Sequence, residues 1–161
     1  MNKLCKYGTH RVISPEGTLP QSADRVDNNM ICHDNEILVD VNILNVDSAS
    51  FTQIRKVCDS DISKMKQMIF DIVSQKGKLQ NPVTGSGGMF IGRIKEVGKG
   101  LKLSVGVGDA IASLVSLSLT PLKIEEIVAI DLDKDQVKIV GQAILFETGI
   151  FAKIPDDLPA N

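Results

Sequence analysis

Residues 85–112 read GSGGMFIGRIKEVGKGLKLSVGVGDAIA, in which a glycine cluster is followed at once by an apolar, β-branched run. A glycine-rich loop binds phosphate when it joins a strand to a helix N-terminus. Here Asn81-Pro82 precedes the glycines, and Phe90 stands where the last glycine of G-x-G-x-x-G would be. We therefore expect a tight turn leading into a strand over 89–97, and no nucleotide site at this loop.

The sequence that follows continues as strands separated by short polar turns. Two segments carry this pattern, DAIASLVSLSL at 109–119 and IEEIVAIDLDKDQVKIVGQAILF at 124–146, and a hairpin is expected within the second at 133–136. A closed or nearly closed barrel would hide the edges of so many strands. The Pro-rich end, FAKIPDDLPAN at 151–161, shows no further periodic segment.

The first half of the chain contains the helical signals. EILVDVNIL at 36–44 places Ile37, Val39, Val41 and Ile43 on one face of a strand. From 61 to 77 the apolar residues recur every three or four positions, between a capping Asp61 and Gly77, which predicts an amphipathic helix. A shorter helix or an irregular turn is expected at 51–58, and residues 1–35 are expected to form an extended arm with turns.

Composition limits the class of protein. With 161 residues and 43% hydrophobic content, the chain fits one domain. A net charge of -2 and scattered Lys and Arg argue against a nucleic-acid partner. There is no apolar run of about 20 residues and no signal peptide, so no membrane partner and a cytoplasmic location are expected. Cys5, Cys32 and Cys58 are too widely spaced for a metal or redox motif.

Two motifs resemble the GroES-like domain of medium-chain dehydrogenases. These are the G-x-I-x-E-V-G pattern of Gly92–Gly98 and the V-G-D pattern at 107–112. The resemblance extends over nearly the whole chain, through 10–21, 35–54, 81–89 and 114–124, to a zinc-independent branch that deaminates a diamino acid. It implies a mainly β fold: a GroES-like, partly open β-barrel with one or two helices.

The same resemblance implies an activity and its partners. We expect an NAD-dependent oxidoreductase of lysine fermentation that acts on an amino group of a small diamino acid substrate. NAD would be bound by a Rossmann domain that is absent from these 161 residues and belongs to the same protein or to a companion chain. A homodimer is a further partner to consider. Zinc-dependent relatives have Cys after the first long strand and His in the glycine-rich turn. Here 45–50 lacks Cys, and Ser86-Gly87 stands at the turn, so no metal is expected.

Candidate site residues follow from the positions that match these two loops. Asp47 and Ser48 are the catalytic candidates, since a carboxylate can bind an amine and hydroxyls can pass a proton. The substrate-binding candidates are Ser50, Phe51, Thr84 and Ser86. The alternative for Asp47 and Ser48 is a purely structural role as caps of the following helix. No residue is assigned to the cofactor.

An aspartate-rich segment and two histidines also suggest metal binding or catalysis, and each has a structural alternative. Asp131, Asp133 and Asp135 alternate as in a calcium loop, but the Gly and Glu of that loop are missing, which favours a hairpin turn. His10 and His33 are expected to be surface or structural residues. The alternative function is a free-standing barrel that acts as a binding or assembly module, with 78–90 as its docking loop.

Overall fold

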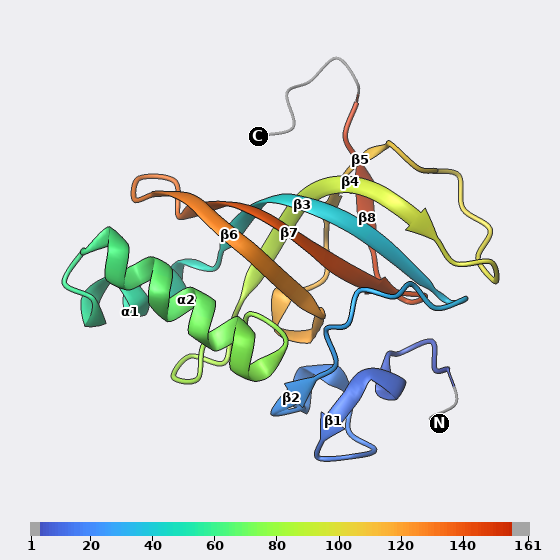
Figure 1. Ribbon diagram of the computed structural model, residues 1–161, viewed down its shortest axis with the longest axis horizontal. Helices are drawn as coiled ribbons and strands as arrows, with labels where there is room; N and C mark the ends of the chain where they lie inside the picture. The colour runs from blue at the N-terminus through green and yellow to red at the C-terminus, as the bar shows by residue number, and fades with distance from the viewer. Residues whose placement is uncertain (1–3, 156–161) are drawn as a thin grey trace.

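The computed structural model describes residues 4–155 as a curved six-stranded sheet with two helices at one end and a small N-terminal sheet below it (Figure 1). Its helices are α1 Ser48–Val57 and α2 Ile62–Lys76, with short 3-10 helices η1 Thr9–Arg11, η2 Pro20–Ser22 and η3 Leu117–Leu119. Its strands are β1 Val12–Ser14, β2 Arg25–Val26, β3 Glu36–Val46, β4 Gly88–Val97, β5 Ala110–Ser113, β6 Leu122–Asp131, β7 Gln136–Phe146 and β8 Phe151–Lys153.

The large sheet is antiparallel and open. Its strand order is β6-β7-β3-β4-β5-β8, so β6 and β8 form its two edges. The predicted mainly β, partly open barrel with two helices is confirmed. The hairpin joining β6 to β7 turns at 132–135, where Asp131 accepts hydrogen bonds from the backbone of Asp133 and Lys134. This aspartate-rich segment is therefore the predicted turn.

The longer helix, α2, begins and ends as its sequence predicts. Asp61 caps α2 through its side chain, and Gly77 ends it in the left-handed conformation with φ 73°. A methyl group on Gly77 would also come within 2.0 Å of the Val26 carbonyl oxygen. The shorter helix, α1, starts three residues earlier than predicted because Asp47 caps it. The inner faces of both helices pack on the sheet.

The central strand β3 departs from strict alternation. Ile37, Val39 and Val41 enter the main core, whereas Leu38 packs on the opposite face. The pairing register shifts between Val41 and Ile43 on both neighbouring strands. Such a bulge reverses the facing of every later residue. Leu44, rather than the predicted Ile43, therefore continues the main core.

Three other expectations need correction. DAIASLVSLSL does not form one strand, since β5 ends at Ser113 and η3 follows. The C-terminal segment does contain a strand, because β8 pairs with β5 through its backbone, which requires no side-chain period. The N-terminal arm includes the short elements η1, β1, η2 and β2. Residues 156–161 of the Pro-rich end lie outside the described part of the chain.

A buried ion network fixes the N-terminal arm to β3. Arg11 donates to both carboxylate oxygens of Glu36, at 2.8 and 2.7 Å, and His10 Nε2 lies 2.8 Å from Oε2. Glu36 is fully buried and Arg11 is 1% exposed. The Arg11 guanidinium also donates to the carbonyl oxygens of Asp27, Asn29 and Ile31. The rings of His10 and His33 pack edge to face beside this network, so both histidines have a structural role in the arm.

Glu36 is expected to make the fold sensitive to acid. Burial alone raises its pKa, but hydrogen bonds from His10 and Arg11 and the Arg11 charge lower the pKa from 4.5 to about 2. Because the pKa is lower in the folded state, the stabilisation is complete above pH 4.5 and is lost as the pH falls towards 2. Urea midpoints measured across this window should fall steeply, and Glu36→Gln should flatten the curve. An equal slope in both proteins would contradict this assignment.

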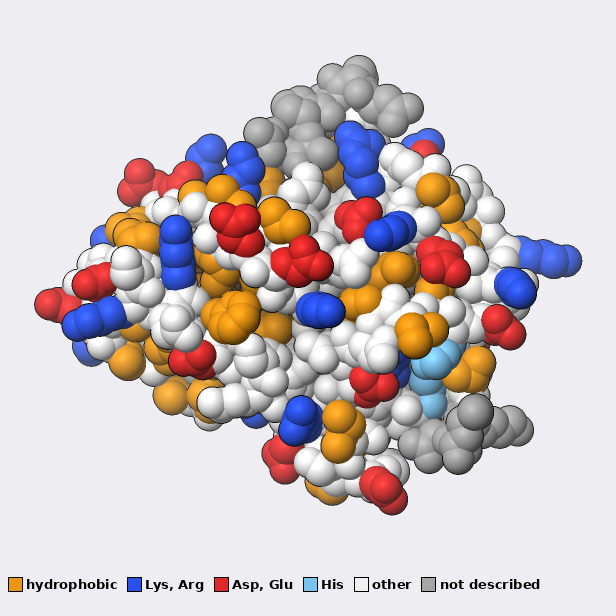
Figure 2. All heavy atoms as spheres, in the orientation of Figure 1, with side chains coloured by type: hydrophobic (Ala, Val, Ile, Leu, Met, Phe, Trp, Pro, Cys, Tyr) orange, Lys and Arg blue, Asp and Glu red, His pale blue; other side chains and the backbone are white. Residues whose placement is uncertain are grey.

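The outer surface carries charges of both signs. On the face shown in Figure 2, Lys and Arg side chains alternate with Asp and Glu rather than gathering in one patch. In residues 4–155, no helix has the length and apolar character needed to cross a membrane.

Candidate functional site

The candidate site lies where β3 ends and β4 begins. Val46 pairs with Gly88 across these antiparallel strands, so the loop after β3 and the loop before β4 lie side by side. The Asp47 amide donates to the Gly87 carbonyl oxygen at 2.9 Å, which joins the two loops directly. The sheet pairing thus brings together two segments that are 40 residues apart.

Glycine is required at this junction by the close approach of the backbones. Gly88 has a φ of 135°, and a Cβ atom there would lie 2.1 Å from the Asn45 carbonyl oxygen. A Cβ atom on Gly87 would lie 2.4 Å from the carbonyl oxygen of Leu79. The predicted tight turn into a strand is confirmed, and these contacts are its physical reason.

A carboxylate and two hydroxyls gather at the surface of this junction. Asp47 Oδ1 accepts from the Ala49 amide at 3.0 Å and, over a long 3.5 Å, from Ser86 Oγ. Ser86 Oγ lies 2.9 Å from Thr84 Oγ1. Asp47 and Thr84 are exposed and Ser86 is half-buried. We call Asp47, Thr84 and Ser86 the carboxylate-hydroxyl cluster.

The other predicted site residues lie next to this cluster or below it. Ser48 is exposed at the first position of α1, beside Asp47. Ser50 is fully buried, and its hydroxyl has no hydrogen-bond partner within residues 4–155. Phe51 is 2% exposed and belongs to the main core. These two side chains face inward, so the accessible part of the predicted site consists of Asp47, Ser48, Thr84 and Ser86.

Asp47 has the structural role of a helix cap. Its side chain caps α1 by accepting from the Ala49 amide. This bond and the one from Ser86 both go to Oδ1. A cap and a ligand site are compatible because a carboxylate can accept about four hydrogen bonds.

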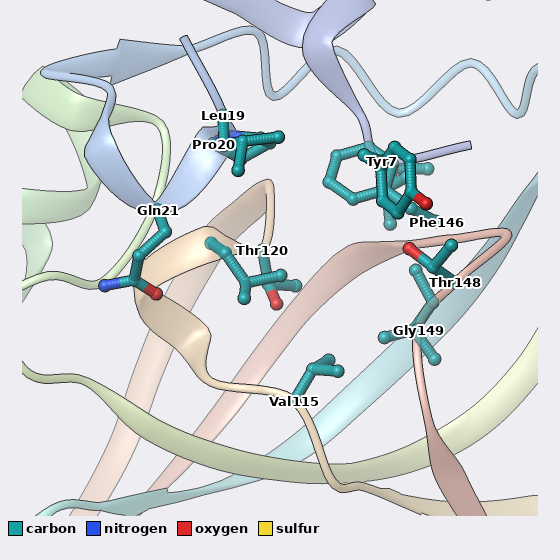
Figure 3. A pocket seen from close by; sticks show the side chains of 12 residues that line it. Tyr7, Leu19, Pro20, Gln21, Val115, Thr120, Phe146, Thr148 and Gly149 are labelled. Atoms are coloured by element: carbon teal, nitrogen blue, oxygen red, sulfur yellow. The ribbon is translucent and has the colours of Figure 1, made fainter. Parts of the chain in front are cut away.

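An apolar pocket of about 260 Å³ lies beyond η3 (Figure 3). It is formed by the arm, the segment after β5 and the end of β7, with Tyr7, Leu19, Pro20, Val115, Leu119 and Phe146 among its lining residues. Gln21 connects it to the candidate site, since its Oε1 accepts from Ser118 Oγ and its carbonyl oxygen accepts from Gln80. Gln80 in turn donates to Gly85 of the glycine-rich loop.

Two buried polar residues near the site are absent from the sequence predictions. Lys78 is fully buried and donates to the Pro20 carbonyl oxygen at 2.6 Å, while burial lowers its pKa to about 8. Asn81 is fully buried beneath the glycine-rich loop. Both residues precede the glycines in the sequence, where nothing distinguishes them from exposed polar residues. Only the tertiary structure shows that their side chains are buried.

Metal donors do not gather in the described part of the chain. In residues 4–155, no group of three or more His, Cys, Asp or Glu side chains has the arrangement of a metal site. The hydroxyl of Ser86, where the sequence predicts that a metal-binding His is replaced, belongs to the carboxylate-hydroxyl cluster.

The fold and the site together define a class. The curved, partly open sheet and the paired loops at the ends of β3 and β4 fit a GroES-like domain. The model for the N-terminal domain of L-erythro-3,5-diaminohexanoate dehydrogenase matches residues 10–155. The chain therefore belongs to this family.

Two relatives carry the same name. The L-erythro-3,5-diaminohexanoate dehydrogenase of Fusobacterium nucleatum subsp. nucleatum is 56% identical over 163 residues, covering 100% of this chain and 47% of that protein. The enzyme of Acetoanaerobium sticklandii is 58% identical over 158 residues, covering 97% of this chain and 46% of that protein. The chain thus spans about half the length of these relatives.

Similar solved structures include two oxidoreductases. The CurK enoyl reductase has a TM-score of 0.41 and 15% identity, covering 98% of this chain and 36% of that one. Galactitol-1-phosphate dehydrogenase from Escherichia coli has a TM-score of 0.40 and 15% identity, covering 82% and 34%.

Proposed function

We propose that this chain is the N-terminal catalytic domain of an NAD-dependent dehydrogenase that converts L-erythro-3,5-diaminohexanoate to 5-amino-3-oxohexanoate in lysine fermentation. The names and high identity of the two relatives support this substrate. The observation that carries the site assignment is the exposed carboxylate-hydroxyl cluster at the ends of β3 and β4. The reaction oxidises C3, and water then replaces the 3-amino nitrogen, which leaves as ammonia.

The cluster has the chemistry that a diamino acid requires. Both substrate amines are ammonium groups near neutral pH, and a carboxylate attracts them. Asp47 binds one ammonium group, and Ser48 lies beside it. Before C3 can be oxidised, its amine must lose a proton. Thr84 and Ser86 offer hydroxyls through which that proton can pass towards Asp47.

The described residues do not fit the phosphates of NAD. The N-termini of α1 and α2 are capped by Asp47 and Asp61, whose carboxylates would repel a phosphate. The glycine-rich loop leads into β4 rather than into a helix. We propose that a Rossmann domain, in the same or a companion chain, binds the dinucleotide. The chain alone is then expected to form no NADH from the substrate. Zinc independence and a cytoplasmic location are part of the same proposal.

Replacing Asp47 tests the site. Asp47→Asn keeps a good helix cap but removes the charge, so kcat/KM for the diamino acid should fall by about 10- to 100-fold, as for a lost charged hydrogen bond of about 1.5–3 kcal/mol. The KM for NAD should not change. NADH formation is measured with the protein in which this chain is joined to its nucleotide-binding domain.

Asp61→Asn is the matched control, since Asp61 caps α2 in the same way. If Asp61→Asn has wild-type kinetics and Asp47→Asn has a lowered kcat/KM, a substrate role for Asp47 is supported. Equal kinetics in both variants would leave Asp47 as a cap only and remove the site assignment.

The alternative, a free-standing assembly module, is not favoured. Its only candidate docking loop was 78–90. Leu79 and Phe90 of this loop are buried in the core of the chain itself, which leaves Val83 and Met89 as its exposed large apolar side chains. The names of the relatives also point to a dehydrogenase.

A further inference from the structure

We propose that Asn81 is a positioning residue that holds the hydroxyls of Thr84 and Ser86 against the N-terminal end of α1. This inference rests on the proposed function, because it concerns the same substrate site. Asn81 itself is fully buried and cannot touch a substrate. It acts only through the loop it fixes.

The side chain of Asn81 connects the loop to the helix. Its Oδ1 accepts from the amides of Val83 and Thr84, at 2.8 and 3.2 Å. Its Nδ2 donates to Gln53 Oε1 at 2.8 Å and to the Ser50 carbonyl oxygen at 3.4 Å. One end of the amide thus shapes the loop, and the other attaches it to the first two turns of α1.

The backbone of Asn81 closes the same loop. Its amide donates to the Ser86 carbonyl oxygen at 2.8 Å, and its carbonyl oxygen accepts from the Gly85 amide at 2.7 Å. Residues 81–86 therefore form a closed turn with Asn81 at its base. Thr84 and Ser86, on the outer side of that turn, point their hydroxyls at each other.

This arrangement matters because few bonds set the distance between the two halves of the site. Asp47 belongs to the start of α1, whereas Thr84 and Ser86 belong to the loop. Two hydrogen bonds link the loop to the start of α1: the one from the Asp47 backbone amide to Gly87 and the long one from Ser86 to Asp47. Among residues 4–155, the other hydrogen bonds between loop and helix come from the side-chain amide of Asn81. Without it, the hydroxyls lose their fixed distance from the carboxylate.

The test is steady-state kinetics of the protein joined to its nucleotide-binding domain. Asn81→Ala should raise the KM for L-erythro-3,5-diaminohexanoate and lower kcat/KM by about 10- to 100-fold, as for a catalytic group displaced by about 1 Å. The KM for NAD should stay at the wild-type value. A residue that only stabilises the fold would lower the melting temperature and the active fraction but leave both KM values unchanged.

A second pair of variants keeps the test decisive if Asn81→Ala fails to fold. Gln53 is only half-buried. Gln53→Met removes the nearer acceptor of Asn81 Nδ2 and leaves only the 3.4 Å bond to the Ser50 carbonyl oxygen, so the substrate KM should rise. Gln53→Glu keeps an acceptor at this position, so its substrate KM should equal that of the wild type. Asn28→Ala is the matched control, because Asn28 donates its side-chain hydrogen bond to Leu122, away from the site.

The outcomes separate this inference from the proposed function. A raised substrate KM in Asn81→Ala and Gln53→Met, with normal values in Gln53→Glu and Asn28→Ala, supports it. If Ser86→Ala raises the KM but Gln53→Met and Asn81→Ala do not, the positioning role is wrong while the site stands. If Asp47→Asn and Ser86→Ala are both without effect, the proposed site fails and this inference fails with it.

Discussion

Arg11→Met is expected to destabilise the chain by about 3–5 kcal/mol, the usual loss when one partner of a buried ion pair is removed. Methionine can fill the space of the aliphatic stem but donates no hydrogen bond. Glu36 would then be a fully buried carboxylate without its main partner, and three carbonyl oxygens of the arm would lose their donor. Urea unfolding followed by circular dichroism measures the loss.

Two further variants test the cause. Arg11→Met combined with Glu36→Leu removes both charges, so the double variant should be more stable than Arg11→Met alone. Lys153→Met breaks the partly exposed pair in which Lys153 Nζ lies 3.7 Å from Asp109 Oδ1, and should cost less than about 1 kcal/mol. If Arg11→Met cost no more than Lys153→Met, the network would not anchor the arm.

Gly88→Ala is the second substitution with a large expected effect, a loss of roughly 3 kcal/mol or more. The positive φ of Gly88 strains any other residue, and the added methyl group would collide with the Asn45 carbonyl oxygen and the Asp47 amide. Since both contacts belong to the end of β3, the pairing of β3 with β4 must open. The substrate site should be lost with it, and denaturant unfolding and activity can both be measured.

Alanine substitutions at two other glycines distinguish the cost of backbone strain from the cost of a steric clash. Gly108 also has a positive φ, 93°, but a methyl group there meets nothing within 4 Å, so Gly108→Ala should cost only about 1 kcal/mol. At Gly106 the φ is not positive and the space is open, so Gly106→Ala should be close to neutral. If Gly88→Ala lowered the free energy of unfolding by no more than Gly108→Ala does, β4 would be able to move away from β3.

Local patterns were enough to predict the two helices and the long strands. The helix at 61–77 is a clear case, because its cap, its apolar period and its final glycine all lie within one continuous segment. The strand at 36–44 was also predicted, but the bulge that turns Leu44 inward was not. A bulge depends on how β3 aligns with β4 and β7, and single-strand alternation contains no information on that alignment.

The candidate site was predicted only in part. Asp47, Ser48, Thr84 and Ser86 were predicted as site residues because the loops that carry them match a family pattern, and the structure brings these two loops side by side. The burial of Asn81 and Lys78 was not predicted, because the sequence does not distinguish a buried Asn or Lys from an exposed one. Their burial follows from the packing of α1 and η2 against the glycine-rich loop, segments that are distant in sequence.

The sequence by itself determined the mainly β class, the two helices, the glycine turn and the family, since each depends on local periods, caps or motifs. Only the tertiary structure decided that Arg11 and Glu36 form a buried pair, that Ser50 and Phe51 face inward, and that Asn81 ties a loop to α1. The physical reason is the same in each case. Burial and hydrogen-bond partners depend on contacts between distant segments, and these contacts exist only once the helices and the N-terminal arm have packed against the sheet.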